Sequence, residues 1–318
     1  MKRILISTMT MILGMSSMTA NGQEAPKDAS RDAAVDQMFD RAMSLTQDRE
    51  QKTSIEAMRK ARDTRQERKI DIEPTPMPAA FNGTQRNCLI GGQYLNTFWT
   101  KLSGADSTQC KVMMIGDSHV AGQILPNTLE QRLKQKWPFL GFKQLSKNGV
   151  QINYFLDDKQ FSQVVAYKPD LLIVSVGTNE AHGNFVTEKY QTLMQRLVDK
   201  VHAAMPQCVM LFTTGPGSHN RTYGYRTENG KRVRYVLTKT PNDVNQTVAD
   251  CQVDYCRKNN IAIWDMYDIV GGKANACNNW VTTKLMRDDY VHFYKEGYQL
   301  QGNMLFDAIY GSYWAWKK

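Results

Sequence analysis

The feature that most constrains the fold is a repeated change between short apolar runs and longer amphipathic runs, which begins near residue 110. Apolar runs bounded by Gly, Pro or polar residues predict buried strands, whereas residues 187–206 place apolar side chains on one helical face. Strands and helices that alternate in this way favour a parallel sheet covered by helices, an α/β fold. We predict strands over residues 111–116, 142–147, 171–176, 209–214 and 261–264, and a final helix over residues 296–316.

One segment departs from the alternation. Residues 218–243 alternate polar with aromatic or aliphatic side chains around Asn229-Gly230, which predicts a β-hairpin. The segment follows the carboxyl end of the fourth predicted strand, and open α/β sheets bind ligands at that edge. The hairpin either forms a wall of the site or is an exposed projection without a role in the site.

The first 22 residues have the layout of a secretory signal peptide, because Lys2 and Arg3 precede an apolar run and then small residues. Cleavage near Ala20 or Gly22 would leave no integral membrane span, and an uncleaved anchor is the alternative. We therefore expect an exported protein, periplasmic or extracellular.

Residues 23–86 are rich in charge, contain two aromatic residues and end in three closely spaced prolines. Apolar spacing over residues 33–47 predicts a surface helix there. This region is interpreted as an N-terminal arm of helix and linker, and residues 87–318 as the functional domain.

The formal net charge of +9 would become +7 after loss of a leader that contains Lys2 and Arg3. Such an excess suits an anionic polymer such as a cell-wall glycan, and it equally suits simple solubility. The sequence shows no zinc-finger spacing and no compact basic stripe with interleaved aromatics, so no nucleic-acid partner is predicted.

Six cysteines in an exported chain make disulfides an expectation, although six allow 15 full pairings. A bond between Cys251 and Cys256 is disfavoured, because a five-residue step on a helix turns the side chains about 140° apart. The cysteines lack metal-ligand spacing, and no metal or cofactor is predicted.

The residues that carry chemistry begin at the first predicted strand, where four apolar residues lead into Gly116, Asp117, Ser118 and His119. Other polar residues follow later strands: Gly149 after the second, Asn179 in "GTNEA" after the third, and Asp289 with His292 near the end. In a parallel sheet these positions meet at one edge.

This ordered set resembles the SGNH hydrolase superfamily, also called GDSL hydrolases, which is marked by a serine, a glycine, an asparagine and a histidine in that order. The resemblance covers roughly residues 109–312 and is strongest in "IGDSH" and "DYVHFYKEGYQLQG". Glu180 stands where the family usually has Asp, and with His119 this variant is similar to the branch of peptidoglycan and polysaccharide O-acetylesterases. The resemblance implies a flavodoxin-like three-layer α/β/α fold.

The resemblance also implies the roles of the site residues. Ser118 would be the nucleophile, His292 the general base and Asp289 the residue that fixes the histidine tautomer. The backbone N–H groups of Ser118 and Gly149 and the amide of Asn179 would stabilise the oxyanion.

Several neighbours compete for these roles or have two interpretations. Asp117 is interpreted as a structural turn residue, with catalysis as its alternative, and His119 either starts a helix or contacts substrate. Asp288 competes with Asp289, and Gly141 with Gly149. The residues predicted to line a substrate cleft are His119, Glu180 and His182.

The resulting functional prediction is an exported serine esterase that removes acetyl groups from a carbohydrate. Its partner would be an acetylated glycan or another small ester. The alternatives on the same fold are a lipase or carboxylesterase and an O-acetyltransferase. A further alternative is a glycan-binding protein without catalysis.

Overall fold

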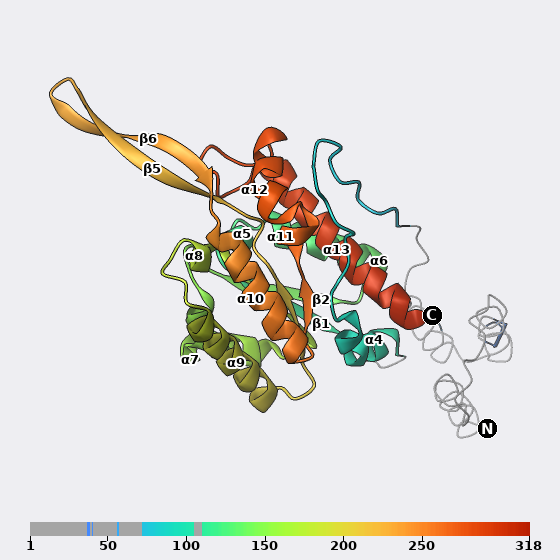
Figure 1. Cartoon of the computed structure of the whole chain (residues 1–318). Coiled ribbons are helices and arrows are strands. Elements are labelled where there is room, and N and C mark those ends of the chain that lie inside the picture. The colour runs from blue at the N-terminus through green and yellow to red at the C-terminus, as the bar shows by residue number, and fades with distance from the viewer. Residues whose placement is uncertain (1–36, 39, 41–55, 57–71, 105–109) are drawn as a thin grey trace. The chain divides into compact units, whose positions relative to one another are not determined.

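The computed structural model describes residues 37, 38, 40, 56, 72–104 and 110–318 of the 318-residue chain (Figure 1). The predicted signal peptide lies outside the described residues, as does most of the helix expected over residues 33–47. One compact unit carries the sheet and comprises Ile70–Leu102, Gln109–Lys134 and Leu140–Lys318.

The centre of this unit is a five-stranded, fully parallel sheet, in the order β2-β1-β3-β4-β7. Every predicted strand is present, and its ends differ from the prediction by at most one residue. The strands are β1 (Lys111–Gly116), β2 (Gly141–Ser146), β3 (Leu171–Ser175), β4 (Val209–Thr213) and β7 (Ala262–Trp264). The α/β fold class is therefore confirmed.

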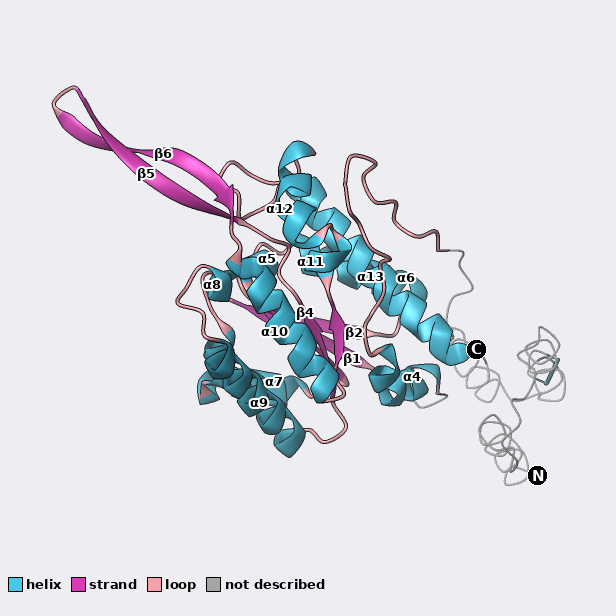
Figure 2. Cartoon of the chain, viewed as in Figure 1, coloured by secondary structure: helices cyan, strands magenta, loops and turns pink. Residues whose placement is uncertain are grey.

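Helices cover both faces of the sheet, with α9 and α10 on one side and α6 and α13 on the other (Figure 2). The helices are α4 (Asn96–Ser103), α5 (Ser118–Ala121), α6 (Ile124–Lys136), α7 (Asp158–Tyr167), α8 (Thr178–Ala181), α9 (Thr187–Ala204), α10 (Val244–Lys258), α11 (Met266–Ile269), α12 (Gly272–Thr282) and α13 (Lys295–Lys317). Two short 3-10 turns, Gly92–Leu95 and Ile152–Leu156, complete the elements. None of the described helices is both long and apolar enough to cross a membrane.

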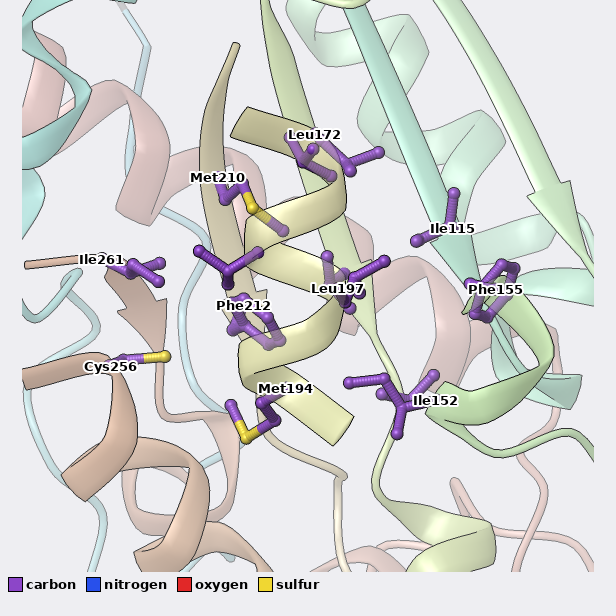
Figure 3. Packing of buried hydrophobic residues seen from close by; sticks show 14 of the residues in the cluster. Ile115, Ile152, Phe155, Leu172, Met194, Leu197, Met210, Phe212, Cys256 and Ile261 are labelled. Atoms are coloured by element: carbon purple, nitrogen blue, oxygen red, sulfur yellow. The ribbon is translucent and has the colours of Figure 1, made fainter. Parts of the chain in front are cut away.

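The main core cluster lies between one face of the sheet and helices α7, α9 and α10. Ile115, Leu172 and Phe212 point from three neighbouring strands toward Met194 and Leu197 of α9 (Figure 3). Strands buried on both faces are continuously apolar, which explains why the sequence predicts them so closely.

The segment that departs from the alternation forms a two-stranded antiparallel hairpin, β5 (His219–Glu228) and β6 (Lys231–Pro241), which projects from the domain (Figure 1). Its turn places Asn229 at φ 49° and Gly230 at φ 74°. Two consecutive positive φ values define the type I′ turn that suits the twist of a two-residue hairpin, and Asn-Gly is its preferred sequence.

Residues 72–86, assigned above to the arm, pack against the domain. Phe81 is buried with its ring edge-on to Trp280, 5.0 Å between centroids. The backbone N–H of Thr75 donates to Asp307, and that of Gln85 to the carbonyl of Ile269. The domain thus includes this stretch, upstream of the predicted boundary at residue 87.

The disulfide expectation is wrong for this structure. All six cysteines lie among the described residues and none of them forms a disulfide bond; five of them are buried. Cys251 and Cys256 both lie on α10, where the helical step separates them. Burial raises the pKa of Cys208 to about 12, which keeps that thiol protonated as an apolar packing group.

Candidate active site

Ser118 lies at the carboxyl edge of the sheet, as the first residue of α5 directly after β1. Asp117 caps this helix: its Oδ1 accepts the backbone N–H of His119 at 2.9 Å, and its own N–H donates to Ser175 of the neighbouring strand. Asp117 is 1% exposed, which supports its structural interpretation. Ser118 is held in a partly exposed position by a buried turn.

His292 and Asp289 come from a closed loop before α13. Met286 and Phe293 form an isolated antiparallel bridge that closes the loop, and Arg287 donates its backbone N–H to the carbonyl of His292 at 2.7 Å. Asp289 Oδ1 accepts the backbone N–H groups of Val291 and His292, at 3.0 and 2.9 Å. These two hydrogen bonds hold the Asp289 carboxylate against the backbone of its own loop.

The structure brings the serine, histidine and aspartate into one hydrogen-bonded row. His292 Nε2 lies 2.9 Å from Ser118 Oγ, and His292 Nδ1 lies 2.8 Å from Asp289 Oδ2. An ionised carboxylate can only accept, so Nδ1 carries the proton and Nε2 is free to accept the serine hydroxyl. Asp288 is exposed and takes no part in this row.

Asp289 is ionised at neutral pH. Burial raises the pKa of its carboxyl, but hydrogen bonds from the backbone and ring of His292 and from the backbone of Val291 outweigh burial, and the pKa falls to about 2. A permanent carboxylate holds the imidazole in one tautomer and favours the imidazolium that forms when a proton is taken up.

Gly149 lies on the loop after β2, and Asn179 lies in the short helix α8 after β3. Gly149 is exposed and has φ 73°, a left-handed conformation that favours glycine. The Asn179 amide donates to the carbonyl of Val150 at 2.9 Å and makes a longer contact of 3.4 Å with Asp117 Oδ2. Gly141 pairs with Lys111 at the opposite edge of the sheet, so it is too far from Ser118 to compete with Gly149.

Glu180 binds the backbone of the segment that follows Gly149. Its side chain is buried, and Oε1 accepts the backbone N–H of Ile152 at 2.8 Å. Burial raises the pKa of Glu180 to about 7, and burial together with the charge of Glu180 raises that of Asp117 to about 7. The prediction that Glu180 lines a cleft is wrong, because only 4% of the residue is exposed.

His119 also lies beneath the site and does not line a cleft. It is 4% exposed, and its ring nitrogens contact Tyr298 Oη at 3.2 Å and Thr178 Oγ1 at 3.1 Å. Its ring centroid is 5.6 Å from that of His292. Burial, and then the nearby His292, lower the pKa of His119 to about 3, so it is a neutral hydrogen-bonding group that packs behind His292.

His182 is exposed at the rim of the site, and its Nε2 lies 2.9 Å from Ser218 Oγ. Sequence reasoning missed Tyr298 and Thr178, the partners of His119. Both residues belong to the motifs "KEGY" and "GTNEA", but only the folded chain shows that they contact His119, which is 179 and 59 residues away in the sequence.

A three-layer α/β/α fold with a serine, a histidine and a carboxylate in a row at the carboxyl edge of its sheet defines a serine-hydrolase type of architecture. The sequence matches the GDSL-like lipase/acylhydrolase family over residues 114–300, more than half of the chain. The protein therefore belongs to that family, an ester-hydrolysing branch of the SGNH superfamily.

Several solved structures are similar to this chain at low sequence identity. A peptidoglycan O-acetylesterase is 14% identical with a TM-score of 0.57, and the match covers 74% of this chain and 98% of that one. A GDSL-like lipase from Bacteroides thetaiotaomicron is 16% identical with a TM-score of 0.47, covering 70% and 99%. An acetyl-xylooligosaccharide esterase from Geobacillus is 15% identical with a TM-score of 0.43, covering 63% and 93%. No curated protein matches the sequence.

Proposed function

We propose that this protein is an exported serine esterase that removes acetyl groups from carbohydrate. The observation that carries the proposal is the row in which His292 joins Ser118 to Asp289. Nucleophile and base come from segments 174 residues apart and meet at hydrogen-bond distance, with the base held by a third group.

Acylation begins when Ser118 Oγ attacks the acetyl carbonyl carbon. His292 Nε2 takes the hydroxyl proton as the new C–O bond forms, and the carbonyl oxygen becomes an oxyanion. When this tetrahedral intermediate collapses, the bond to the sugar oxygen breaks and His292 returns the proton to that oxygen. The products are a free sugar hydroxyl and an acetyl-Ser118 ester.

Deacylation repeats the sequence with water. His292 Nε2 takes a proton from water, the hydroxide oxygen attacks the acetyl carbon, and the bond to Ser118 Oγ breaks as the proton returns to it. Acetate leaves and the serine hydroxyl is restored. Asp289 stays ionised throughout and stabilises each imidazolium.

The oxyanion donors in this proposal are the N–H groups of Ser118 and Gly149 and the amide of Asn179. The loop that carries Gly149 is joined to Asn179 of α8 by the hydrogen bond from Asn179 to Val150. The positive end of α5 adds little, since this helix has only four residues. The three hydrogen-bond donors therefore carry the stabilisation.

Two observations support a carbohydrate ester over a lipid. Two exposed polar side chains, His182 and Arg221, lie near His292 or near each other at the rim of the site. The fold neighbour with a TM-score of 0.57 is itself an O-acetylesterase. Export rests on the leader-like first 22 residues.

A panel of p-nitrophenyl esters of increasing chain length and of acetylated glycans tests the proposal, with the Ser118→Ala variant beside the parent. We expect release of acetate from the glycans, a fall in rate with longer acyl chains, and labelling of Ser118 by a fluorophosphonate. Preference for long acyl chains would show a lipase. Transfer of acetyl to an added sugar in place of water would show an acetyltransferase, and no labelling would contradict an active site altogether.

A further inference from the structure

The β5–β6 hairpin has two chemically different faces. Residues directly opposite each other in an antiparallel pair share a face, and successive residues alternate between faces. The register pairs Arg221 with Lys239, Tyr225 with Arg234 and Thr227 with Arg232, and a bulge between Thr222 and Tyr223 absorbs one extra residue of β6. The basic face, as we name it, contains Arg221, Tyr223, Tyr225, Arg232, Arg234 and Lys239.

The basic face carries four cationic side chains and no acidic one. The only acidic residue of the two strands, Glu228, lies on the opposite face, where it forms a 2.7 Å ion pair with Arg226. None of the ion pairs among the described residues involves Arg221, Arg232 or Arg234. The positive charge of this face is therefore not neutralised by the hairpin itself.

Stacking on tyrosine rings orders the cations of the basic face. The guanidinium carbon of Arg232 lies 4.0 Å from the ring centroid of Tyr225, and that of Arg234 lies 3.3 Å from that of Tyr223. A stacked guanidinium keeps its N–H fork at the edge, where it can bind a carboxylate through two parallel hydrogen bonds. Both tyrosines are exposed, Tyr225 to 54%.

The basic face leads into the loop that carries His292. At its base, the Lys239 ammonium donates to the carbonyl of Asp288 at 2.8 Å and lies 3.8 Å from the ring centroid of Tyr290. The backbone N–H of His219 donates to the carbonyl of Tyr290 at 2.9 Å. Arg221 is near enough to lower the pKa of His182 at the rim, after the larger effect of burial.

We propose that the basic face binds an extended glycan bearing carboxylates, and that it holds this polymer so that its acetyl esters reach Ser118. The proposal rests on the esterase function above and names its substrate class, an O-acetylated acidic polysaccharide. Strand β5, with ten residues, spans about 34 Å, which accommodates several sugar units in a row. Charge complementarity selects the polymer, and the contacts of Lys239 and His219 with the loop direct it to the site.

The hairpin also corrects the expectation that the chain has no basic stripe with interleaved aromatics, since the stripe exists only after two strands are paired. Such a surface suits nucleic acid as well as an acidic glycan. The glycan is favoured because the stripe ends at an ester-hydrolysing site, for which a phosphodiester backbone offers no substrate. Nucleic acid and a second copy of the chain remain outcomes of the test.

The test compares two double variants of equal charge change in the full protein. Arg232→Gln with Arg234→Gln removes two charges from the basic face, and Arg226→Gln with Lys231→Gln removes two from the opposite face. Binding to polygalacturonate is measured by affinity electrophoresis at low and high salt, with neutral dextran as the reference polymer. We expect the first variant to bind polygalacturonate about 10-fold or more weakly and the second to lose less than about 3-fold.

Equal loss in both variants, or no binding of polygalacturonate by the parent at low salt, would overturn the proposal. If the parent bound single-stranded DNA more tightly than polygalacturonate, the basic face would be a nucleic-acid site and the proposal would be overturned. If the parent were a dimer that only the basic-face variant dissociated, the occupant would be a second copy of the chain. Hydrolysis of p-nitrophenyl acetate by the parent is measured in parallel. Its absence would contradict the esterase function separately from the binding result, and circular dichroism verifies that both variants fold.

Discussion

The side-chain amide of Asn179 donates a hydrogen bond of 2.9 Å to the carbonyl oxygen of Val150. This bond joins the short helix α8, which follows β3, to the loop that carries Gly149. An amide has two hydrogens, and the second faces Asp117 Oδ2 only at 3.4 Å. One hydrogen thus anchors a loop, while the other has a long contact that it can exchange for a stronger acceptor.

Asn179→Ala should lower kcat for an acetyl ester by roughly 100- to 1000-fold with little change in KM, because an oxyanion donor acts mainly in the transition state. Asn179→Asp should be at least as damaging, since it turns a carboxylate toward the carbonyl of Val150 and the Asp117 side chain. Steady-state kinetics measures both, and thermal unfolding shows how much each loses as a loop anchor. Retention of most of the parent kcat by Asn179→Asp would leave Asn179 as an anchor only.

Ser118→Ala and His292→Ala should each lower kcat/KM for p-nitrophenyl acetate by about 10⁴-fold or more, because nucleophile and base act as a unit. For the same reason, the double variant should be no worse than either single one. Steady-state rates of the three variants measure this, and near-parent circular dichroism is the control. If the losses of kcat/KM in the two single variants multiplied in the double variant, Ser118 and His292 would not act in the same step.

The sequence predicts the sheet closely because its inner strands β1, β3 and β4 are buried over almost their whole length, so their apolar runs are continuous and their ends are abrupt. It also predicts which residues follow the strands, and strands such as β1 and β3 then bring Ser118 and Asn179 to one edge without further information. A contact within one loop can also be predicted from the spacing of its residues, as the contact between Asp289 and His292, three residues apart, shows.

Burial beneath the site could not be predicted in the same way. His119 and Glu180 are polar residues in short, partly exposed motifs, and the packing of α13 and of the 3-10 turn that begins at Ile152 encloses them. The basic face of the hairpin depends on a bulge that shifts β6 by one residue, and one residue decides on which face a side chain lies. The burial of Phe81 depends on contact with a helix some 200 residues later in the sequence.

Phe81→Ala should lower the free energy of unfolding by about 3 kcal/mol, since it removes a buried ring from Trp280 and leaves a cavity. Urea denaturation followed by tryptophan fluorescence measures the change. Gln85→Ala is the matched control, because the side chain is exposed and the backbone bond to Ile269 is retained. A loss below about 0.5 kcal/mol in Phe81→Ala, the range of ordinary surface substitutions, would show that residues 72–86 do not belong to the folded unit.

Glu180 makes the stability of the protein depend on pH. Its pKa is raised in the folded state from 4.5 to about 7, so the folded protein keeps a proton that the unfolded chain releases at lower pH. The stabilising effect of that proton is complete below about pH 4.5 and is lost as pH rises through about 7. Glu180→Gln keeps a carbonyl oxygen to accept the Ile152 N–H and has no proton to lose.

The Tm of Glu180→Gln should therefore match that of the parent near pH 5 and exceed it near pH 8, with the difference opening between these values. Thermal unfolding of both proteins at several pH values measures this difference, and Glu188→Gln, at an exposed position on α9, is the control for a general effect of lost charge. Glu180→Ala separates charge from hydrogen bonding, because it leaves the Ile152 N–H without an acceptor and should be destabilised by about 1–3 kcal/mol at every pH. A Tm difference between Glu180→Gln and the parent that is the same at pH 5 and pH 8 would show that Glu180 is ionised in the folded protein throughout, and that the carboxylate, not its protonated form, holds the Gly149 loop.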